Sequence, residues 1–212
     1  MDKPIFKKGK KYTFSDYFDL SNPTEEIIEE LGYSFSIEVL SLPVAESVYK
    51  IKELRERFYN ILPKISLNSE IAKRDFMIAP ILLEVISYAD AKMNVEYSIE
   101  IDDRLSGSLD YLIRSKQDVI VIEAKKGDLD KGFNQLSAEL IALDKYENED
   151  SPELLYGAVS IGDVWRFGIL KRKSKVVVKD IHSYRIPEDT EKVFMILLGI
   201  IQSPEKPNLL NC

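Results

Sequence analysis

The feature of this sequence that most constrains its fold is a short apolar run that leads directly into charged residues. Residues 119–126 read Val-Ile-Val-Ile-Glu-Ala-Lys-Lys. Side chains alternate between the two faces of an extended chain, which groups Glu123 and Lys125 with Val119 and Val121. A run that is apolar on both faces predicts a strand in the middle of a sheet. This strand would carry a carboxylate and an amine to the end of a hydrophobic core.

A second carboxylate, Asp110, is predicted to lie opposite Glu123. The segments 109–115 and 118–126 are expected to pair as an antiparallel hairpin, through a two- or four-residue loop around residues 116–117. This pairing sets the two carboxylates directly opposite each other, with Cβ atoms about 5 Å apart. Carboxylates that close repel unless a proton or cation lies between them, and Mg²⁺ favours such oxygen ligands. The pattern predicts a metal site, and the alternative is a surface hairpin with solvated charges.

Such a site is suited to the hydrolysis of a phosphate ester. A metal ion held by one or two carboxylates keeps positions open for water and a phosphate oxygen, and it lowers the pKa of its water. The ammonium of Lys125 would neutralise charge on the phosphoryl oxygens or orient the attacking water. We therefore expect Mg²⁺ (or Mn²⁺) as the cofactor and a phosphodiester as the substrate.

These residues resemble a known signature. Asp110, Glu123-Ala124-Lys125 and Gln135 are together similar to the motif of the PD-(D/E)XK nuclease superfamily, with Leu109 at the variable first position of the Pro-Asp pair. A wider stretch, from Ser69 to about Lys171, resembles the nuclease module at the start of type I restriction motor subunits and small stand-alone bacterial proteins of that type. The positions that carry this likeness are Ser69, Glu70, Arg74, Ile78, Pro80, Leu82, Gly107, Asp110, Tyr111, Glu123, Ala124, Lys125, Gln135 and the segment Val159 to Trp165.

The resemblance implies a function and a role for each site residue. Asp110 and Glu123 would hold the metal, Lys125 would act at the scissile phosphate, and Gln135 would support the site from the following helix. The implied activity is that of a metal-dependent, endonuclease-like enzyme that hydrolyses DNA through a metal-activated water, in restriction, defence or repair. Nucleases of this fold often pair to cut both strands, so a homodimer is expected by analogy.

Many members of the superfamily add a helical glutamate as a further metal ligand. Glu70 matches that residue by its distance from Arg74 and Pro80, whereas Glu84 matches by lying later on the same segment. Positions 70, 77 and 84 share one heptad face of a helix, so the sequence does not separate the two. We prefer Glu70 and keep Glu84 as the alternative; for either, the competing interpretation is a solvated helix carboxylate.

The net charge of −7 weighs against a protein that grips DNA through many phosphate contacts. Lys126 and Lys131 flank the proposed site and are the expected nucleic-acid contacts. The basic run 171–175 is expected to be a solvated hairpin turn, with a DNA contact as the alternative. We therefore expect a weak intrinsic affinity for DNA and reliance on a protein partner. The alternative function is that of a non-catalytic binding or regulatory module with the nuclease fold.

The remaining pattern predicts an α/β fold with a restriction-endonuclease-like core, a mixed β-sheet flanked by helices in the order α-β-β-β-α-β. We expect an N-terminal elaboration over residues 1–65 that packs on the core, a PD-(D/E)XK nuclease-like domain over 66–202 and a frayed tail over 203–212. The predicted helices are 24–31, 45–61, 69–92 with a kink at Pro80, 130–146 and 189–202. The predicted strands are 34–42, 95–101, 107–115, 118–126, 155–160, 163–171 and 174–180.

Cysteine and histidine usage excludes several kinds of chemistry. The chain has one cysteine, Cys212, and one histidine, His182. An internal disulfide, a cysteine-based zinc site and a Ser-His or Cys-His hydrolase are therefore not expected. No apolar run approaches a membrane span and no secretory core opens the chain, so we expect a cytoplasmic protein without membrane contact.

Overall fold

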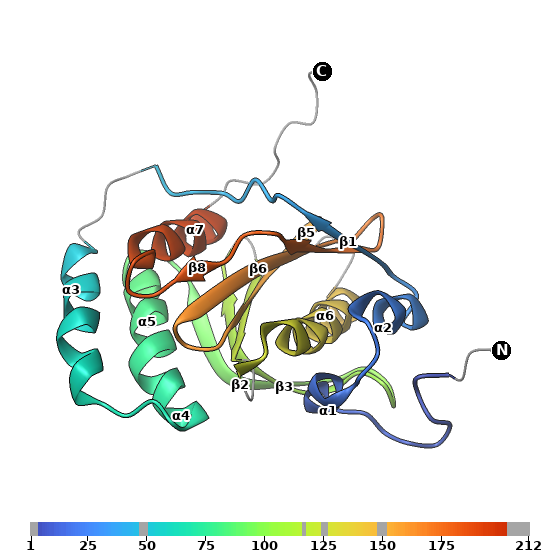
Figure 1. Ribbon diagram of the computed structural model, residues 1–212. Coiled ribbons are helices and arrows are strands. Elements are labelled where there is room, and N and C mark those ends of the chain that lie inside the picture. Colours follow the sequence, from blue (N-terminus) through green and yellow to red (C-terminus); the bar gives the residue numbers. More distant parts are fainter. Residues whose placement is uncertain (1–3, 47–50, 116–117, 124–126, 148–151, 203–212) are drawn as a thin grey trace.

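The computed structural model describes residues 4–46, 51–115, 118–123, 127–147 and 152–202, with the backbone alone for 118–123. An eight-stranded sheet crosses this part of the chain, with helices on both faces (Figure 1). The strands are β1 (Ser34–Glu38), β2 (Lys92–Glu100), β3 (Ser106–Arg114), β4 (Asp118–Glu123), β5 (Leu154–Ser160), β6 (Val164–Lys171), β7 (Val176–Asp180) and β8 (Tyr184–Arg185). The helices are α1 (Phe14–Asp19), α2 (Thr24–Glu30), α3 (Lys52–Ile61), α4 (Glu70–Lys73), α5 (Ala79–Ser87), α6 (Leu129–Tyr146) and α7 (Thr190–Gln202), with a 3₁₀ turn η1 (Leu62–Lys64) and a π-helical turn η2 (Arg74–Ile78).

The predicted α/β class with a mixed sheet is confirmed. The succession α5, β2, β3, β4, α6, β5 is the predicted order of helix, three strands, helix and strand. Across the sheet the strands lie in the order β1, β7, β6, β5, β4, β3, β2, and β8 pairs with β6. The pairs β1–β7 and β4–β5 are parallel and the other pairs are antiparallel. A parallel pair needs a crossover connection, which α6 supplies between β4 and β5.

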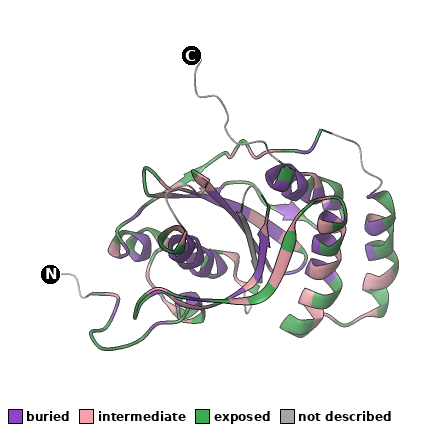
Figure 2. Ribbon diagram, turned by 180° about the vertical axis from the view of Figure 1, so that it is seen from behind, coloured by how far each residue is buried: buried purple, intermediate pink, exposed green. Residues whose placement is uncertain are grey.

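Each face of the sheet carries its own hydrophobic core, because helices cover both faces. On one face α3, α5 and α7 pack over Tyr111, Ala158 and the fully buried Trp165. On the other face α1, α2 and α6 pack over Leu112 and Val159. Neighbouring residues of one strand thus enter opposite cores, as alternation requires. Figure 2 shows the buried strands between the two helical layers.

The residues before position 66 contribute to both cores. β1 pairs with β7 at one edge of the sheet, Phe58 of α3 is buried in one core and Phe14 of α1 is buried in the other. The predicted domain boundary at residue 65 stays a prediction, and the tail 203–212 lies outside the described residues. Within the described part of the chain, no helix has both the length and the apolar character needed to cross a membrane.

The segment predicted as one kinked helix, 69–92, is interrupted by the π-helical turn η2. The helix begins after Ser69, whose hydroxyl caps the first turn of α4. The chain widens into η2 and returns to α-helix one residue before Pro80. Proline lacks an N–H and its ring crowds the carbonyl four residues earlier, so the distortion falls where the sequence predicts it. Such turns are frequent at functional sites, and this one begins with Arg74.

A buried ion pair fixes the last turn of α6 and supports a first prediction. Asp144 accepts hydrogen bonds from Arg172 Nε and from the Tyr33 hydroxyl, both at 2.7 Å, and burial followed by this bond raises the pKa of Tyr33. The Asp144 and Arg172 side chains are 11% and 12% exposed.

Asp144→Ala should lower the free energy of unfolding by about 2–3 kcal/mol, because it removes the carboxylate that balances a largely buried guanidinium. Denaturant unfolding measures this, and Lys173→Ala, which removes an exposed pair with Glu153, should change stability by less than about 1 kcal/mol.

Candidate active site

Asp110 lies where the pairing of β2 and β3 is locally distorted. Tyr97 pairs with Leu109, and the preceding residue, Glu96, has a left-handed backbone with φ of 54°, which is uncommon outside glycine. Alternation would place Leu109 and Tyr111 on one face of the sheet, yet they pack into opposite cores. The strand therefore turns at Asp110, whose side chain is 25% exposed.

The hairpin of β3 and β4 forms as predicted, but its register differs by one residue. Arg114 pairs with Asp118, so three residues connect the strands instead of two or four. An odd connection shifts the pairing by one position. The paired residues end at Tyr111 and Val121, before the distorted position Asp110, so the prediction that Asp110 lies directly opposite Glu123 stays a prediction. The two residues lie on the adjacent strands β3 and β4.

Arg74 joins the two acidic residues of the distorted region. Its Nη1 atom lies 3.8 Å from Asp110 Oδ1 and 3.7 Å from Glu96 Oε1, and its guanidinium lies over the Tyr111 ring, 5.4 Å from the centroid. Burial alone would lower the pKa of Arg74, but the Tyr111 hydroxyl and the two carboxylates raise it. This corner of the molecule therefore attracts positive charge. Sequence reasoning gave Glu96 no role, because its left-handed backbone has no signal in the sequence.

Of the two helical glutamates, Glu70 is placed beside the contact between Arg74 and Asp110. It is the exposed first residue of α4, and its carbonyl accepts a hydrogen bond from the backbone N–H of Arg74. Glu84 lies in α5, ten residues after Arg74, which is about 15 Å along a helix. The geometry favours Glu70, and the assignment of a helical ligand stays a prediction.

The strand β4 ends beside α4. Its last residue, Glu123, pairs in parallel with the buried Ser160 at the end of β5. Ser160 Oγ accepts a hydrogen bond from the backbone N–H of Gly162 at 3.0 Å. Gly162 has a positive φ of 94°, and a Cβ there would lie 3.3 Å from Lys73 Cβ. The turn after β5 thus contacts α4, which brings the carboxyl ends of both strands close to that helix.

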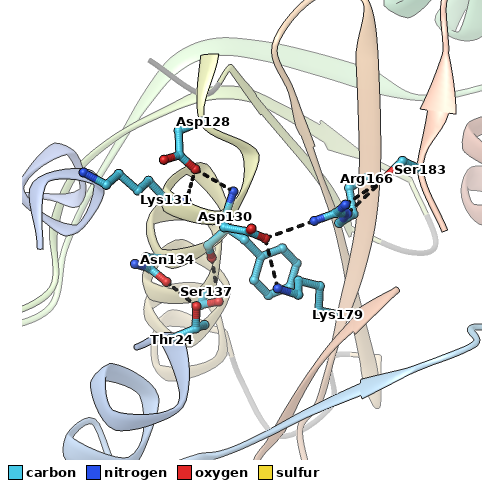
Figure 3. A network of polar contacts seen from close by, with 10 residues as sticks. Thr24, Asp128, Asp130, Lys131, Asn134, Ser137, Arg166, Lys179 and Ser183 are labelled. Atoms are coloured by element: carbon cyan, nitrogen blue, oxygen red, sulfur yellow. Dashed lines mark hydrogen bonds and ion pairs between the residues drawn. The ribbon is translucent and has the colours of Figure 1, made fainter. Parts of the chain in front are cut away.

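A polar network fixes the first turn of α6, as Figure 3 shows. Asp128 caps the helix, and its Oδ1 accepts hydrogen bonds from the backbone N–H groups of Asp130 and Lys131, both at 3.0 Å. Asp130 Oδ1 accepts from Arg166 Nη1 of β6 at 3.0 Å and from Lys179 Nζ of β7 at 3.1 Å. These bonds tie the start of α6 to two strands. Lys131, a predicted DNA contact, is exposed at this helix start.

Gln135 lies in the second turn of α6 and is only 5% exposed. Its Nε2 donates to Glu139 Oε1 at 3.0 Å, as helix residues four apart can. Asn134 accepts a hydrogen bond from α2, and Leu136 lies against Gly157 of β5. Phe133 lies against Gly168 of β6 and the Phe35 ring of β1. Successive helix residues are about 100° apart, so Gln135 is about 200° around α6 from Phe133 and occupies the flank that faces away from β6 and β1. That flank is directed to the β4 and β3 half of the sheet.

Part of the predicted site lies outside the described residues. Lys125 and Lys126 are not described, nor is the side chain of Glu123. Within the described part of the chain, no three His, Cys, Asp or Glu side chains are grouped to hold a metal ion. Surface hollows of about 610 and 310 Å³ lie elsewhere, along α3 and beside Arg104. The ligand set of Asp110, Glu123 and Glu70 therefore stays a prediction.

Comparison with known proteins finds no match to this chain among protein-family models, curated proteins or solved structures. The resemblance to the PD-(D/E)XK superfamily therefore rests on its own residues and stays a prediction. What the structure adds is the α/β fold, the order of its elements and the positions of Asp110, Glu70 and Gln135.

Proposed function

We propose that this protein is a metal-dependent phosphodiesterase that acts on DNA, endonuclease-like, in a cytoplasmic restriction, defence or repair setting. The observation that carries the proposal is the position of Asp110, a partly exposed carboxylate at a distorted point of the sheet. It lies on β3, the strand next to β4, whose last residue is Glu123. The α-β-β-β-α-β order agrees with the superfamily that the sequence resembles.

The described residues at this corner fit a divalent cation by charge and by ligand type. The carboxylates of Asp110 and Glu96 lie 3.8 and 3.7 Å from the same Arg74 nitrogen, so they already converge on a positive group. Carboxylate oxygens are the ligands that Mg²⁺ prefers. In the proposed site Asp110, Glu123 and Glu70 would hold Mg²⁺ or Mn²⁺. The bound ion would lower the pKa of a water molecule and offset charge on the phosphate.

The chain's own groups would supply the remaining steps. Lys125 would neutralise the charge that develops on the phosphoryl oxygens as water attacks phosphorus and the P–O bond breaks. Gln135 would support the site from α6, whose start is fixed by its network to β6 and β7. Lys126 and Lys131 would contact the DNA backbone, where each cation offsets one phosphate charge.

A non-catalytic nuclease-fold module is the second candidate, and the basic run 171–175 favours it. Two of its lysines are already paired with carboxylates, Lys171 with Glu38 at 3.4 Å and Lys173 with Glu153 at 2.9 Å. The run forms the turn between β6 and β7, as predicted. Cations engaged in this way, on a chain of net charge −7, offer little to a DNA backbone. Such a module would bind a partner without hydrolysis.

The test is a cleavage assay on supercoiled plasmid and single-stranded DNA with Mg²⁺ or Mn²⁺. Wild-type protein should cleave, whereas Glu123→Ala and Lys125→Ala should lose activity, because each removes a charge that the reaction uses. Lys171→Ala is the matched control, since it removes a lysine that is already paired with Glu38. No cleavage with intact metal binding would point to a missing partner or substrate, and no metal binding either would favour the non-catalytic module. Equal cleavage by all variants would assign the activity to another site.

A further inference from the structure

Glu139 is a carboxylate with no solvent exposure in the middle of α6. Twelve consecutive residues of this helix, Gly132 to Leu143, are buried, and most of them are apolar. Moving a carboxylate from water into such surroundings costs free energy that an apolar side chain of similar size would not. For packing alone, leucine would be the more favourable residue at position 139. The presence of a glutamate there is therefore not explained by the stability of the fold.

The reason lies in the contact between Glu139 and Gln135. A carboxylate only accepts hydrogen bonds, so the Gln135 amide turns its NH₂ group toward Glu139 Oε1, and Nε2 lies 3.0 Å from that atom. The amide oxygen must then point the other way. Gln135 Oε1 is buried and has no hydrogen-bond partner among the described residues. A buried carbonyl oxygen in a folded protein normally accepts a hydrogen bond.

We propose that Glu139 is a positioning residue for the reaction, which it serves by fixing the amide of Gln135 with the oxygen directed to the site. This inference rests on the proposed function. Gln135 occupies the flank of α6 that is directed to the β4 and β3 half of the sheet, where Asp110 and Glu123 lie. The donors that the reaction brings there are an ammonium group and a water molecule, and an oriented amide oxygen would hold either one.

The test compares two substitutions of Glu139 in plasmid cleavage with Mg²⁺. Glu139→Leu removes the acceptor and should lower kcat about 10- to 100-fold with KM unchanged, the loss usual for outer partners of a site. Its far-UV circular dichroism should match that of the wild type, so that the loss of rate is measured on folded protein. Glu139→Gln keeps an acceptor oxygen and should restore most of the rate. A purely structural role predicts an unchanged kcat in the folded variants.

The matched control is the neighbouring buried amide. Asn134 is 4% exposed and accepts a hydrogen bond from the Thr24 hydroxyl at 2.6 Å, on the flank of α6 toward α2. Asn134→Ala should lower Tm and leave kcat unchanged. Wild-type kcat in Glu139→Leu would overturn the proposal, and so would equal losses in Glu139→Leu and Glu139→Gln.

A measurement on the wild type keeps the proposal falsifiable if Glu139→Leu does not fold. The side-chain NH₂ signals of Gln135, assigned by their loss in Gln135→Leu, should exchange slowly with water because the group is bonded to a buried carboxylate. Fast exchange would overturn the inference. If the wild type cleaves no DNA, the proposed function fails and the positioning role fails with it. If the wild type cleaves and the Glu139 variants match it, this inference alone fails.

Discussion

Asp110→Asn is expected to lower Mg²⁺-dependent cleavage of DNA by about 100-fold or more. The substitution keeps the size of the side chain and removes the charge that would bind the metal. Loss of a partner outside the coordination shell costs about 10- to 100-fold, so loss of a direct ligand should reach at least the upper end of that range. The ion pair with Arg74, at 3.8 Å, is also lost, but both side chains keep solvent exposure and the fold should persist. Nicking rates across a Mg²⁺ titration measure the effect, and high Mg²⁺ should restore part of the rate.

Asp75→Asn is the matched control for this prediction. Asp75 is exposed and follows Arg74 directly in η2, so its substitution removes the same charge from the same region. Its cleavage rate should equal that of the wild type. Calorimetry with Mn²⁺ should show heat for the wild type and for Asp75→Asn, and little for Asp110→Asn. Equal rates in all three proteins would remove Asp110 from the proposed ligand set.

The elements that the sequence predicts well are those with a sustained apolar period. The helix predicted over 130–146 is α6 (Leu129–Tyr146), and its apolar residues Phe133, Leu136 and Leu140 are buried. The strand predicted over 163–171 is β6 (Val164–Lys171). In both, many side chains meet a core, so the pattern repeats often enough to set the type of element. Their limits agree within a residue or two, because the pattern ends where the core ends.

Short elements held by distant contacts escape such reasoning. The helix α1 has six residues, Phe14–Asp19, too few to show a period. Its one local signal is at the start, where the Asp16 carboxylate accepts a hydrogen bond from the backbone N–H of Thr13 at 2.8 Å. The strand β8 has two residues and exists through pairing with β6. Tertiary contacts define both elements, and no window of the sequence contains those contacts.

Period and spacing predict the elements around the candidate site better than they predict its geometry. The hairpin, the helix after it and the proximity of Gln135 to Glu139 follow from period and spacing. The register of the hairpin depends on whether its connection has an odd or even number of residues. The predicted connection of two or four residues is even, whereas the observed one has three. The distortion at Asp110 and Glu96 arises where α4 and η2 meet the strands, a contact between distant segments.

Phe58→Ala is expected to lower the free energy of unfolding by about 3–5 kcal/mol, the cost of removing a large aromatic side chain from a core. Phe58 has no solvent exposure and belongs to the core formed by α3, α5, α7 and one face of the sheet. It also lies within residues 1–65, which the sequence predicts to be an elaboration packed on the core of the nuclease-like domain. Denaturant unfolding followed by circular dichroism measures the change. One cooperative transition is expected for wild type and variant, because the same core joins both parts of the chain.

Tyr59→Ala provides the control, since Tyr59 is the next residue of the same helix and is 48% exposed. It should change stability by less than about 0.5 kcal/mol, as surface substitutions usually do. A loss below about 1 kcal/mol for Phe58→Ala, or a separate early transition, would show that α3 adds little to the core and that residues 1–65 are loosely attached. A large loss in a single transition would mean that the segment before residue 66 is part of the folding unit that holds Asp110 and α6 in place. Any attempt to isolate the nuclease-like domain would then have to retain it.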